Sequence, residues 1–201
     1  MYFEQRLPHC LESIYLRKNA YKKLIEALNL LPQQYSLILY DGYRPLQVQK
    51  YLFHQFSEKI KSHKPHLTKE QILEETLRFV AYPSVEPYQT SPHITGGAID
   101  LTLGDKYGDP HDLGSAFDEI SERSATRYYE ENPHENVEAL KNRRILYNAM
   151  TMVGFTNYSE EWWHFDYGNV TWARRVNAAE AKYGAVEAEI ESHQVKEFRY
   201  L

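Results

Sequence analysis

The sequence contains very little cysteine: Cys10 is the only one among its 201 residues. An intramolecular disulfide needs two cysteines and is therefore excluded, as are zinc modules built from four cysteines or from two cysteines and two histidines. A chain of this length can bury roughly 70% of its unfolded surface without such cross-links. We expect one domain over residues 1–201, held together by a hydrophobic core.

An excess of positive charge and long apolar runs are also missing. The formal net charge is −5 at pH 7, whereas a nucleic-acid surface needs a basic face that replaces phosphate counterions. No stretch approaches the ~20 apolar residues of a membrane span, and MYFEQRLPHC lacks the pattern of a signal peptide. We expect no nucleic-acid partner, no membrane span and a cytoplasmic location, or a periplasmic or cell-surface one if a leader was removed. The oligomeric state is not indicated.

Helical and strand-like patterns alternate along the chain. Apolar spacing, capping signals and stop residues favour helices over residues 17–31, 46–60, 68–81 and 135–153. Short β-prone runs favour strands over residues 36–40, 97–103 and 161–167. The C-terminal tail, about 178–201, is rich in Ala and Glu and is expected to be partly helical. This mixture predicts an α+β fold in which helices pack on a small antiparallel sheet.

Two segments carry residues that suit a catalytic metal. His93 and Asp100 lie seven residues apart in SPHITGGAID, and Glu161 lies three residues before His164 in EEWWH. A catalytic zinc ion takes three nitrogen or oxygen ligands and leaves one position for water. A carboxylate that is not a ligand must then accept a proton from that water. His93, Asp100 and His164 can supply the ligands, and Glu161 can supply the base.

The spacing also constrains the local backbone. Gly96-Gly97 allows the chain to turn between a loop with His93 and a strand with Asp100, so that both side chains can face one point. On one regular strand, an offset of three would place Glu161 and His164 on opposite faces. We therefore expect a bend, or a strand end, between these two residues.

These segments resemble a known family. The patterns Ser-x-His-x-x-Gly-x-Ala-x-Asp and Glu-x-x-His are similar to those of the D-alanyl-D-alanine dipeptidases, within a zinc peptidase group that includes D,D-carboxypeptidases, phage endolysins and hedgehog-like domains. The resemblance runs from about Leu16 to about Gly184. In order, it includes LILYDGYRP, GAIDLTL, LGSAFDEISERS, NRRILYNAMTMVGF and EWWHFDYG. It implies a hedgehog/D,D-peptidase-like fold, one Zn2+ per chain and hydrolysis of D-alanyl-D-alanine in bacterial cell-wall precursor turnover or salvage.

The resemblance also implies roles for individual positions. His93, Asp100 and His164 would bind zinc, and Glu161 would be the general base and then the general acid. Arg44, in DGYRP, would direct its guanidinium at the oxyanion of the tetrahedral intermediate. A fixed and permanently charged donor suits that task because the charge on this oxygen develops only in the transition state.

Two further residues are expected to hold the substrate. Asp118, in SAFDEI, would bind the free amino group of a dipeptide, and Ser91 would contact its carboxylate. Two departures from the family bear on this pocket. First, only about fifteen residues precede Leu16, and they form a divergent or shortened segment in which Tyr2 could supply an aromatic hydroxyl. Second, Pro92 stands beside His93 and lacks a backbone N–H group.

Other interpretations stay open at this point. Taken singly, His93 and His164 could be an ordinary loop histidine and a core histidine, and Arg44 could be a surface turn residue. Asp118 could be a solvated or helix-capping carboxylate. At the level of function, the alternatives are a murein D,D- or L,D-carboxypeptidase or endopeptidase acting on longer peptides, and a non-catalytic zinc-binding interaction domain.

Overall fold

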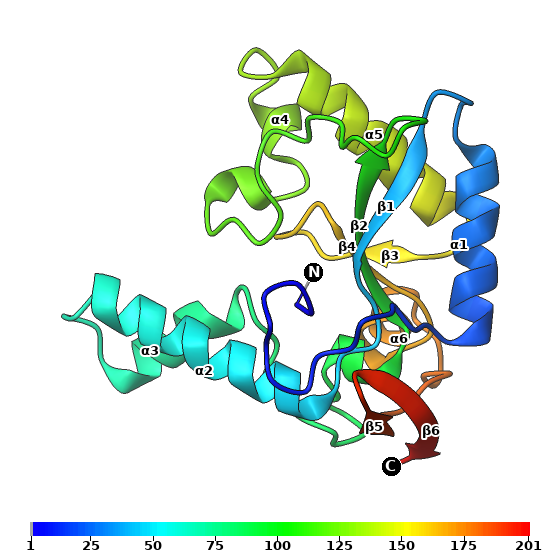
Figure 1. Ribbon diagram of the computed structural model, residues 1–201. Coiled ribbons are helices and arrows are strands. Elements are labelled where there is room, and N and C mark those ends of the chain that lie inside the picture. The colour runs from blue at the N-terminus through cyan, green and yellow to red at the C-terminus, as the bar shows by residue number, and fades with distance from the viewer. Residues whose placement is uncertain (1) are drawn as a thin grey trace.

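The computed structural model describes residues 2–201. Figure 1 shows a central sheet with helices α1 and α5 along one side, while α2 and α3 project to the other side. The α+β fold expected from the sequence is confirmed. In the described part of the chain, no helix has the length and apolar character needed to cross a membrane.

The central sheet is antiparallel and brings distant segments together. Its strands are β1 (Ser36–Asp41), β2 (Ala98–Gly104), β3 (Thr156–Asn157) and β4 (His164–Asp166), in the order β1-β2-β4-β3. Strand β2 is buried along its whole length because it lies between two neighbours and under helices. In the register, Asp100 pairs with Asp41 on one side and with His164 on the other. The sheet thus sets three ionisable residues side by side.

The helices flank this sheet. They are α1 (Lys18–Leu30), α2 (Leu46–His63), α3 (Lys69–Leu77), α4 (Tyr128–Glu131), α5 (Val137–Met152) and α6 (Val170–Arg175). Helices α1 and α5 contact each other, and α5 contacts β2. Leu24, Leu101, Leu146 and Phe165 are part of the core that results. Helix α3 begins with a capping box, in which the Thr68 and Gln71 side chains accept hydrogen bonds from each other's backbone N–H groups.

Two of the expected elements need correction. The strand predicted over residues 161–167 is only His164–Asp166, and the residues before it form a turn. The tail 178–201 contains no helix: strands β5 (Val186–Glu191) and β6 (Gln194–Tyr200) form a separate hairpin. VEAEIE and QVKEFRY alternate in polarity, as strands do, and Ser192 and His193 between them have φ of +50° and +64°. Positive φ at both central residues is the geometry of a tight hairpin turn, and it overrides the helical preference of Ala and Glu.

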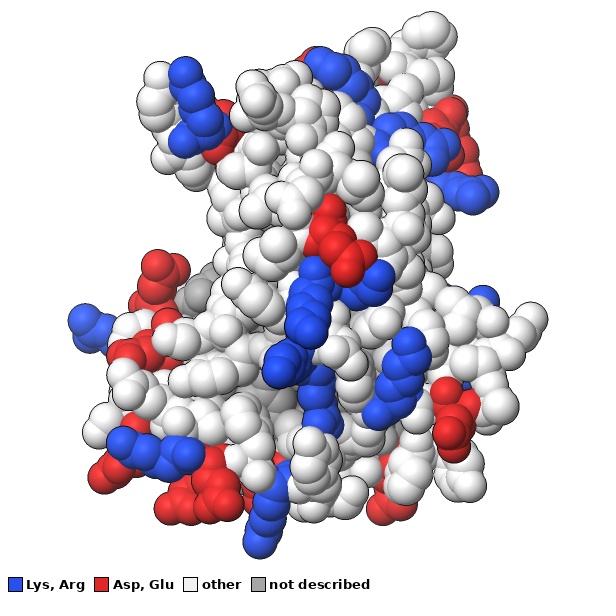
Figure 2. All heavy atoms as spheres, turned by 90° about the vertical axis from the view of Figure 1, so that its right-hand side faces the viewer, with Lys and Arg blue, Asp and Glu red and all other residues white. Residues whose placement is uncertain are grey.

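The surface carries charges of both signs. On the face drawn in Figure 2, Lys and Arg side chains lie close to Asp and Glu side chains. This face does not present the uniformly basic surface that a nucleic acid requires, in agreement with the net charge.

Candidate metal centre

Three buried side chains converge where the middle strands of the sheet meet a short 3-10 helix, η1 (Pro92–Thr95). Strand β2 carries Asp100, strand β4 begins at His164, and η1 carries His93. One potential ligand atom from each of the three residues lies within 4.8 Å of the others. The structure thus brings together the three residues that the sequence singles out as a ligand set.

Two glycines allow this convergence. Gly96 ends η1 with φ of +69°, a conformation that glycine adopts without strain. A Cβ atom on Gly97 would lie 2.5 Å from the carbonyl oxygen of Tyr167, so no larger residue fits there without a shift. The backbone N–H of Tyr167 donates to the carbonyl of Gly97 at 2.7 Å. The predicted turn between His93 and Asp100 is confirmed.

The ring of His93 is oriented by its backbone partner. Nδ1 lies 2.7 Å from the carbonyl oxygen of Gly42, and only a protonated nitrogen can donate to a carbonyl. This hydrogen bond leaves the lone pair on Nε2, which lies 3.2 Å from Oδ2 of Asp100 and 3.3 Å from Nδ1 of His164. A metal-binding histidine is held in this way, with one nitrogen engaged and the other presented to the ion.

The ring of His164 is oriented by a carboxylate. Its Nε2 lies 3.1 Å from Oδ1 of Asp166, and its Nδ1 lies 3.0 Å from Oδ1 of Asp100. Burial alone lowers the pKa of His164, but Asp166 and Asp100 raise it well above its ordinary value. The carboxylates of Asp166 and Asp100 favour a positive charge at His164, which can be a proton on the ring or a metal ion bound to it.

Asp166 is a residue that the sequence analysis did not single out. It is fully buried, and the amide of Asn169 donates to the same Oδ1 atom at 2.6 Å. Its position on β4, two residues after His164, places both side chains on one face of the strand. That offset in His-Phe-Asp was the available signal.

Arg44 is buried beside the three residues and is held by several partners. Its Nε donates to Oδ2 of Asp41 at 2.7 Å, its Nη1 to Oε1 of Gln49 at 2.9 Å and its Nη2 to the Tyr2 hydroxyl at 3.2 Å. Nη2 also lies 3.5 Å from Oδ2 of Asp100. Burial lowers the pKa of the guanidinium, but Tyr2 and the neighbouring carboxylates raise it by more. Arg44 is thus a fixed positive charge and not a surface turn residue.

Glu161 lies in the turn that leads into strand β4. Its backbone N–H donates to the carbonyl of Tyr158 at 3.1 Å, and this turn supplies the bend that the offset to His164 requires. Glu161 as a whole residue is 9% exposed. Burial raises the pKa of Glu161 to about 8, in the range of a group that exchanges protons near neutral pH.

A cleft of about 1240 Å³ contains this cluster. Every site residue predicted from the sequence lines it: Arg44, Ser91, His93, Asp100, Asp118, Glu161 and His164. The cleft continues beside helices α2 and α3, where apolar side chains including Leu52, Phe56 and Leu73 form its wall. The polar cluster therefore lies in a groove that is open to ligands.

Asp118 and Ser91 lie in different surroundings on the cleft wall. Asp118 has a φ of +59° and is solvent-exposed. The protein atoms around it and the charge of Asp100 raise its pKa, an effect that the open water of the cleft weakens. The hydroxyl of Ser91 donates to the carbonyl of Tyr82 and accepts from the N–H of Ser84. The hydroxyl of Ser91 therefore bonds within the loop of residues 82–91, and its proton is not directed at a ligand.

The donor set fits a zinc ion. Two imidazole nitrogens and one carboxylate oxygen are ligands that zinc accepts in catalytic sites. The second nitrogen of each imidazole is already engaged, by Gly42 for His93 and by Asp166 for His164. Such outer partners orient the rings that hold a metal.

Known proteins resemble this chain over most of its length. The D-ala-D-ala dipeptidase family model, Peptidase_M15, matches residues 11–182. A D-alanyl-D-alanine dipeptidase of Synechocystis sp. is 33% identical over 195 residues, with 86% of this chain and 79% of the relative covered. A protein of the same name from Escherichia coli is 32% identical over 152 residues, covering 75% of this chain and 65% of the relative.

A solved structure agrees with the fold. The vancomycin-resistance D,D-pentapeptidase VanY, crystallised as a variant with Zn(II), superposes with a TM-score of 0.52 at 16% identity, covering 82% of this chain and 79% of that chain. The resemblance expected from the motifs is confirmed, as is the peptidase fold. The chain belongs to the D-Ala-D-Ala dipeptidase family of peptidases.

Proposed function

We propose that the chain is a zinc-dependent dipeptidase that hydrolyses D-alanyl-D-alanine. The observation that carries the proposal is the cluster itself: His93, Asp100 and His164 meet within 4.8 Å in a cleft that also contains Glu161 and Arg44. Membership in the dipeptidase family supports the substrate. The presence of both Glu161 and Arg44 beside the ligand set argues against a non-catalytic zinc-binding domain.

In this proposal, His93, Asp100 and His164 hold the zinc ion. When bound, zinc supplies Lewis acidity, which polarises a carbonyl group and lowers the pKa of water. Asp166 and the Gly42 carbonyl keep the two imidazoles in the tautomers that present a lone pair to it. These contacts fix the ligands before the substrate arrives.

Glu161 moves the proton. As water attacks the scissile carbonyl carbon, the Glu161 carboxylate accepts the water proton, and it then delivers this proton to the amine that leaves. Arg44 donates hydrogen bonds to the oxygen that becomes negative during the attack. Because Asp41, Gln49 and Tyr2 already hold the guanidinium, it needs no reorganisation at that moment.

The amino group of the substrate is the part that Asp118 recognises in this proposal. A carboxylate complements an ammonium group, and such a contact favours a substrate with a free N-terminus next to the scissile bond. The proposed contact of Ser91 with the substrate carboxylate requires its hydroxyl to release the Tyr82 carbonyl. A bacterial role in cell-wall precursor turnover or dipeptide salvage, and the cytoplasmic location, also stay predictions.

A second candidate, hydrolysis of longer murein peptides, is favoured by the size of the cleft. Its volume of about 1240 Å³ exceeds the range of roughly 300–1,000 Å³ that accommodates drug-sized ligands. A dipeptide fills only part of it, and the apolar wall of α2 and α3 could contact further residues.

Metal analysis combined with a substrate panel tests both candidates. The panel contains D,D-, L,D- and L,L-dipeptides and one muropeptide that ends in D-Ala-D-Ala. We expect one zinc ion per chain and hydrolysis of the free D,D-dipeptide well above that of the others. Release of D-alanine from the muropeptide at an equal or higher rate would favour the second candidate, and zinc binding without any turnover would contradict both.

A further inference from the structure

The C-terminal hairpin β5–β6 lies beyond residues 11–182, which the family model matches. It packs against the N-terminal segment, defined here as residues 2–15. Figure 1 shows this segment, in dark blue, passing beside helix α2 and strand β1 toward the middle of the molecule, with the hairpin next to it. The N-terminal segment and the C-terminal hairpin are therefore in contact, and Tyr2 of the segment lines the cleft.

His193, in the hairpin turn, makes the central contacts between the two. Its carbonyl accepts a hydrogen bond from the N–H of Glu12 at 3.1 Å. Its ring Nδ1 donates to the carbonyl of Cys10 at 3.0 Å, and the ring meets that of Phe3 edge-on at 5.1 Å. Gln194 donates to the Glu12 carboxylate as well. The hairpin turn thus contacts the N-terminal segment at two places, at Phe3 and at residues 10–12.

The segment packs on helix α2 with its other side. Tyr2, Cys10 and Val48 form a buried cluster that Leu7 and Leu52 complete. The carbonyl of Cys10 accepts a hydrogen bond from His193 in the hairpin, and its side chain packs in the same cluster as Tyr2. A shift of the hairpin would therefore move Cys10 and, through the cluster, Tyr2.

Tyr2 lies on the guanidinium of Arg44. Its ring centroid is 5.1 Å from Cζ, and its hydroxyl accepts from Nη2 at 3.2 Å. The other two nitrogens of Arg44, Nε and Nη1, donate to Asp41 and Gln49, so Tyr2 completes the set of contacts that hold the guanidinium, with Nη2 on the side of Asp100. A cation held over an aromatic face and bonded to its hydroxyl has little freedom to rotate.

We propose that the C-terminal hairpin is a positioning element for the proposed oxyanion donor: through the N-terminal segment, His193 keeps Tyr2 on Arg44. This inference rests on the proposed function, in which Arg44 acts only as charge develops. Loss of the contact should therefore lower kcat and change KM little, since the ground state gains nothing from the guanidinium. The expected fall in kcat is about tenfold, less than the 10²–10³ caused by removing such a donor altogether.

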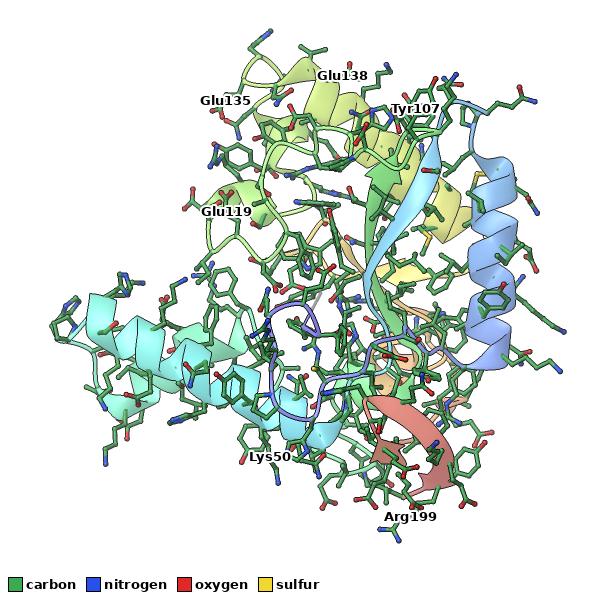
Figure 3. The ribbon with its side chains drawn as sticks, viewed as in Figure 1. Lys50, Tyr107, Glu119, Glu135, Glu138 and Arg199 are labelled. Carbon is green, nitrogen blue, oxygen red and sulfur yellow. The ribbon has the colours of Figure 1, made fainter. Side chains whose placement is uncertain are left out.

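A pair of glycine substitutions in the hairpin turn tests this. His193→Gly deletes the ring and its contacts with Cys10 and Phe3, while Ser192→Gly makes the same change at the neighbouring position. Both residues have positive φ, so glycine suits the backbone at each. Arg199→Ala is a second control, because Figure 3 shows Arg199 pointing away from the molecule below the hairpin. Tyr2→Leu, alone and combined with His193→Gly, completes the set.

We expect His193→Gly to lower kcat for D-Ala-D-Ala at unchanged zinc content, and both controls to match the parent. In the Tyr2→Leu background His193→Gly should have no further effect on kcat. The Glu12 amide keeps its acceptor, the carbonyl of residue 193, but it opens more often once the ring no longer holds Cys10 and Phe3. Its hydrogen exchange, measured independently of activity, should therefore accelerate in His193→Gly and not in the controls.

Other results would overturn the proposal. These are equal kcat for His193→Gly and Ser192→Gly, a full additional loss in the Tyr2→Leu background, or a kcat that falls only in proportion to bound zinc. Absence of turnover in the unchanged protein would instead contradict the proposed function, while faster exchange at Glu12 in His193→Gly would still report the contact between the hairpin and the segment.

Discussion

Nε2 of His164 lies 3.1 Å from Oδ1 of Asp166, a carboxylate without any exposed surface. The contact fixes which nitrogen of His164 carries the proton and directs the other nitrogen at Asp100 and His93. A carboxylate behind a metal-binding imidazole also increases its basicity. Asp166 is therefore expected to determine how tightly the centre binds its ion.

Replacing Asp166 tests this role. Asp166→Asn keeps the size of the side chain but removes its charge, and zinc affinity should fall by about 10–100-fold. Competition with a chromogenic chelator measures the affinity. At saturating zinc, turnover per bound ion should stay close to that of the parent. An unchanged zinc affinity would contradict the role assigned to Asp166.

Removal of the metal should destabilise the fold locally. A ligand that binds only the folded state stabilises it by about 2.7 kcal/mol at a hundredfold excess over its Kd, and the ligand residues join β2, β4 and η1. Chelation should therefore lower Tm and abolish turnover, and added zinc should restore both. His93→Ala should show no zinc-dependent change in Tm. A Tm that is independent of zinc in the parent would count against the site.

Arg44→Lys should be strongly impaired although the positive charge remains. A lysine ammonium cannot donate in the fork-like geometry that Asp41, Gln49 and Tyr2 now fix. We expect kcat to fall by about 10²–10³ with little change in zinc content. Steady-state kinetics with D-Ala-D-Ala gives the result. A variant that retained the parent kcat would show that Arg44 is not the oxyanion donor.

Gly97→Ala should destabilise the protein by about 1–3 kcal/mol, the usual range for overpacking. The new Cβ would meet the Tyr167 carbonyl at 2.5 Å, where the chain enters strand β2. Gly184→Ala is the matched control because an added Cβ there meets nothing within 4 Å. Urea unfolding of both variants gives the two free energies. Equal free energies of unfolding would mean that the Tyr167 carbonyl moves away from residue 97 without destabilising the protein.

The sequence singled out the three residues that the structure brings together, the candidate ligand set, because its signals are local. His93 and Asp100 are joined by a short segment with Gly96-Gly97, and a carboxylate between Ile99 and Leu101 in an apolar strand needs a partner. The bend before His164 also followed from the offset to Glu161. These features depend on period and spacing, which a sequence displays directly.

Contacts between distant segments could not be predicted in this way. Tyr2 contacts Arg44 although they lie 42 positions apart in the chain. Nothing in the sequence around Tyr2 distinguishes it from the other tyrosines as the partner of Arg44. Gln49 looks like an ordinary helical polar residue until its partner is known. The hairpin β5–β6 was missed because Ala and Glu favour helix locally, whereas pairing with a second strand decides the outcome.

In the proposed reaction Glu161 transfers the proton at a zinc centre made by its neighbours, and a comparison of two adjacent glutamates tests this role. Glu161 is buried in the cleft, whereas Glu160 is partly exposed and lies 3.9 Å from Arg78. Turnover of D-Ala-D-Ala and zinc content are measured together for Glu161→Gln and Glu160→Gln. We expect one zinc ion per chain in both, a loss of about 10²–10⁴ in kcat for Glu161→Gln and near-parent activity for Glu160→Gln. Parent-like turnover by Glu161→Gln with its zinc retained would show that Glu161 does not transfer the proton.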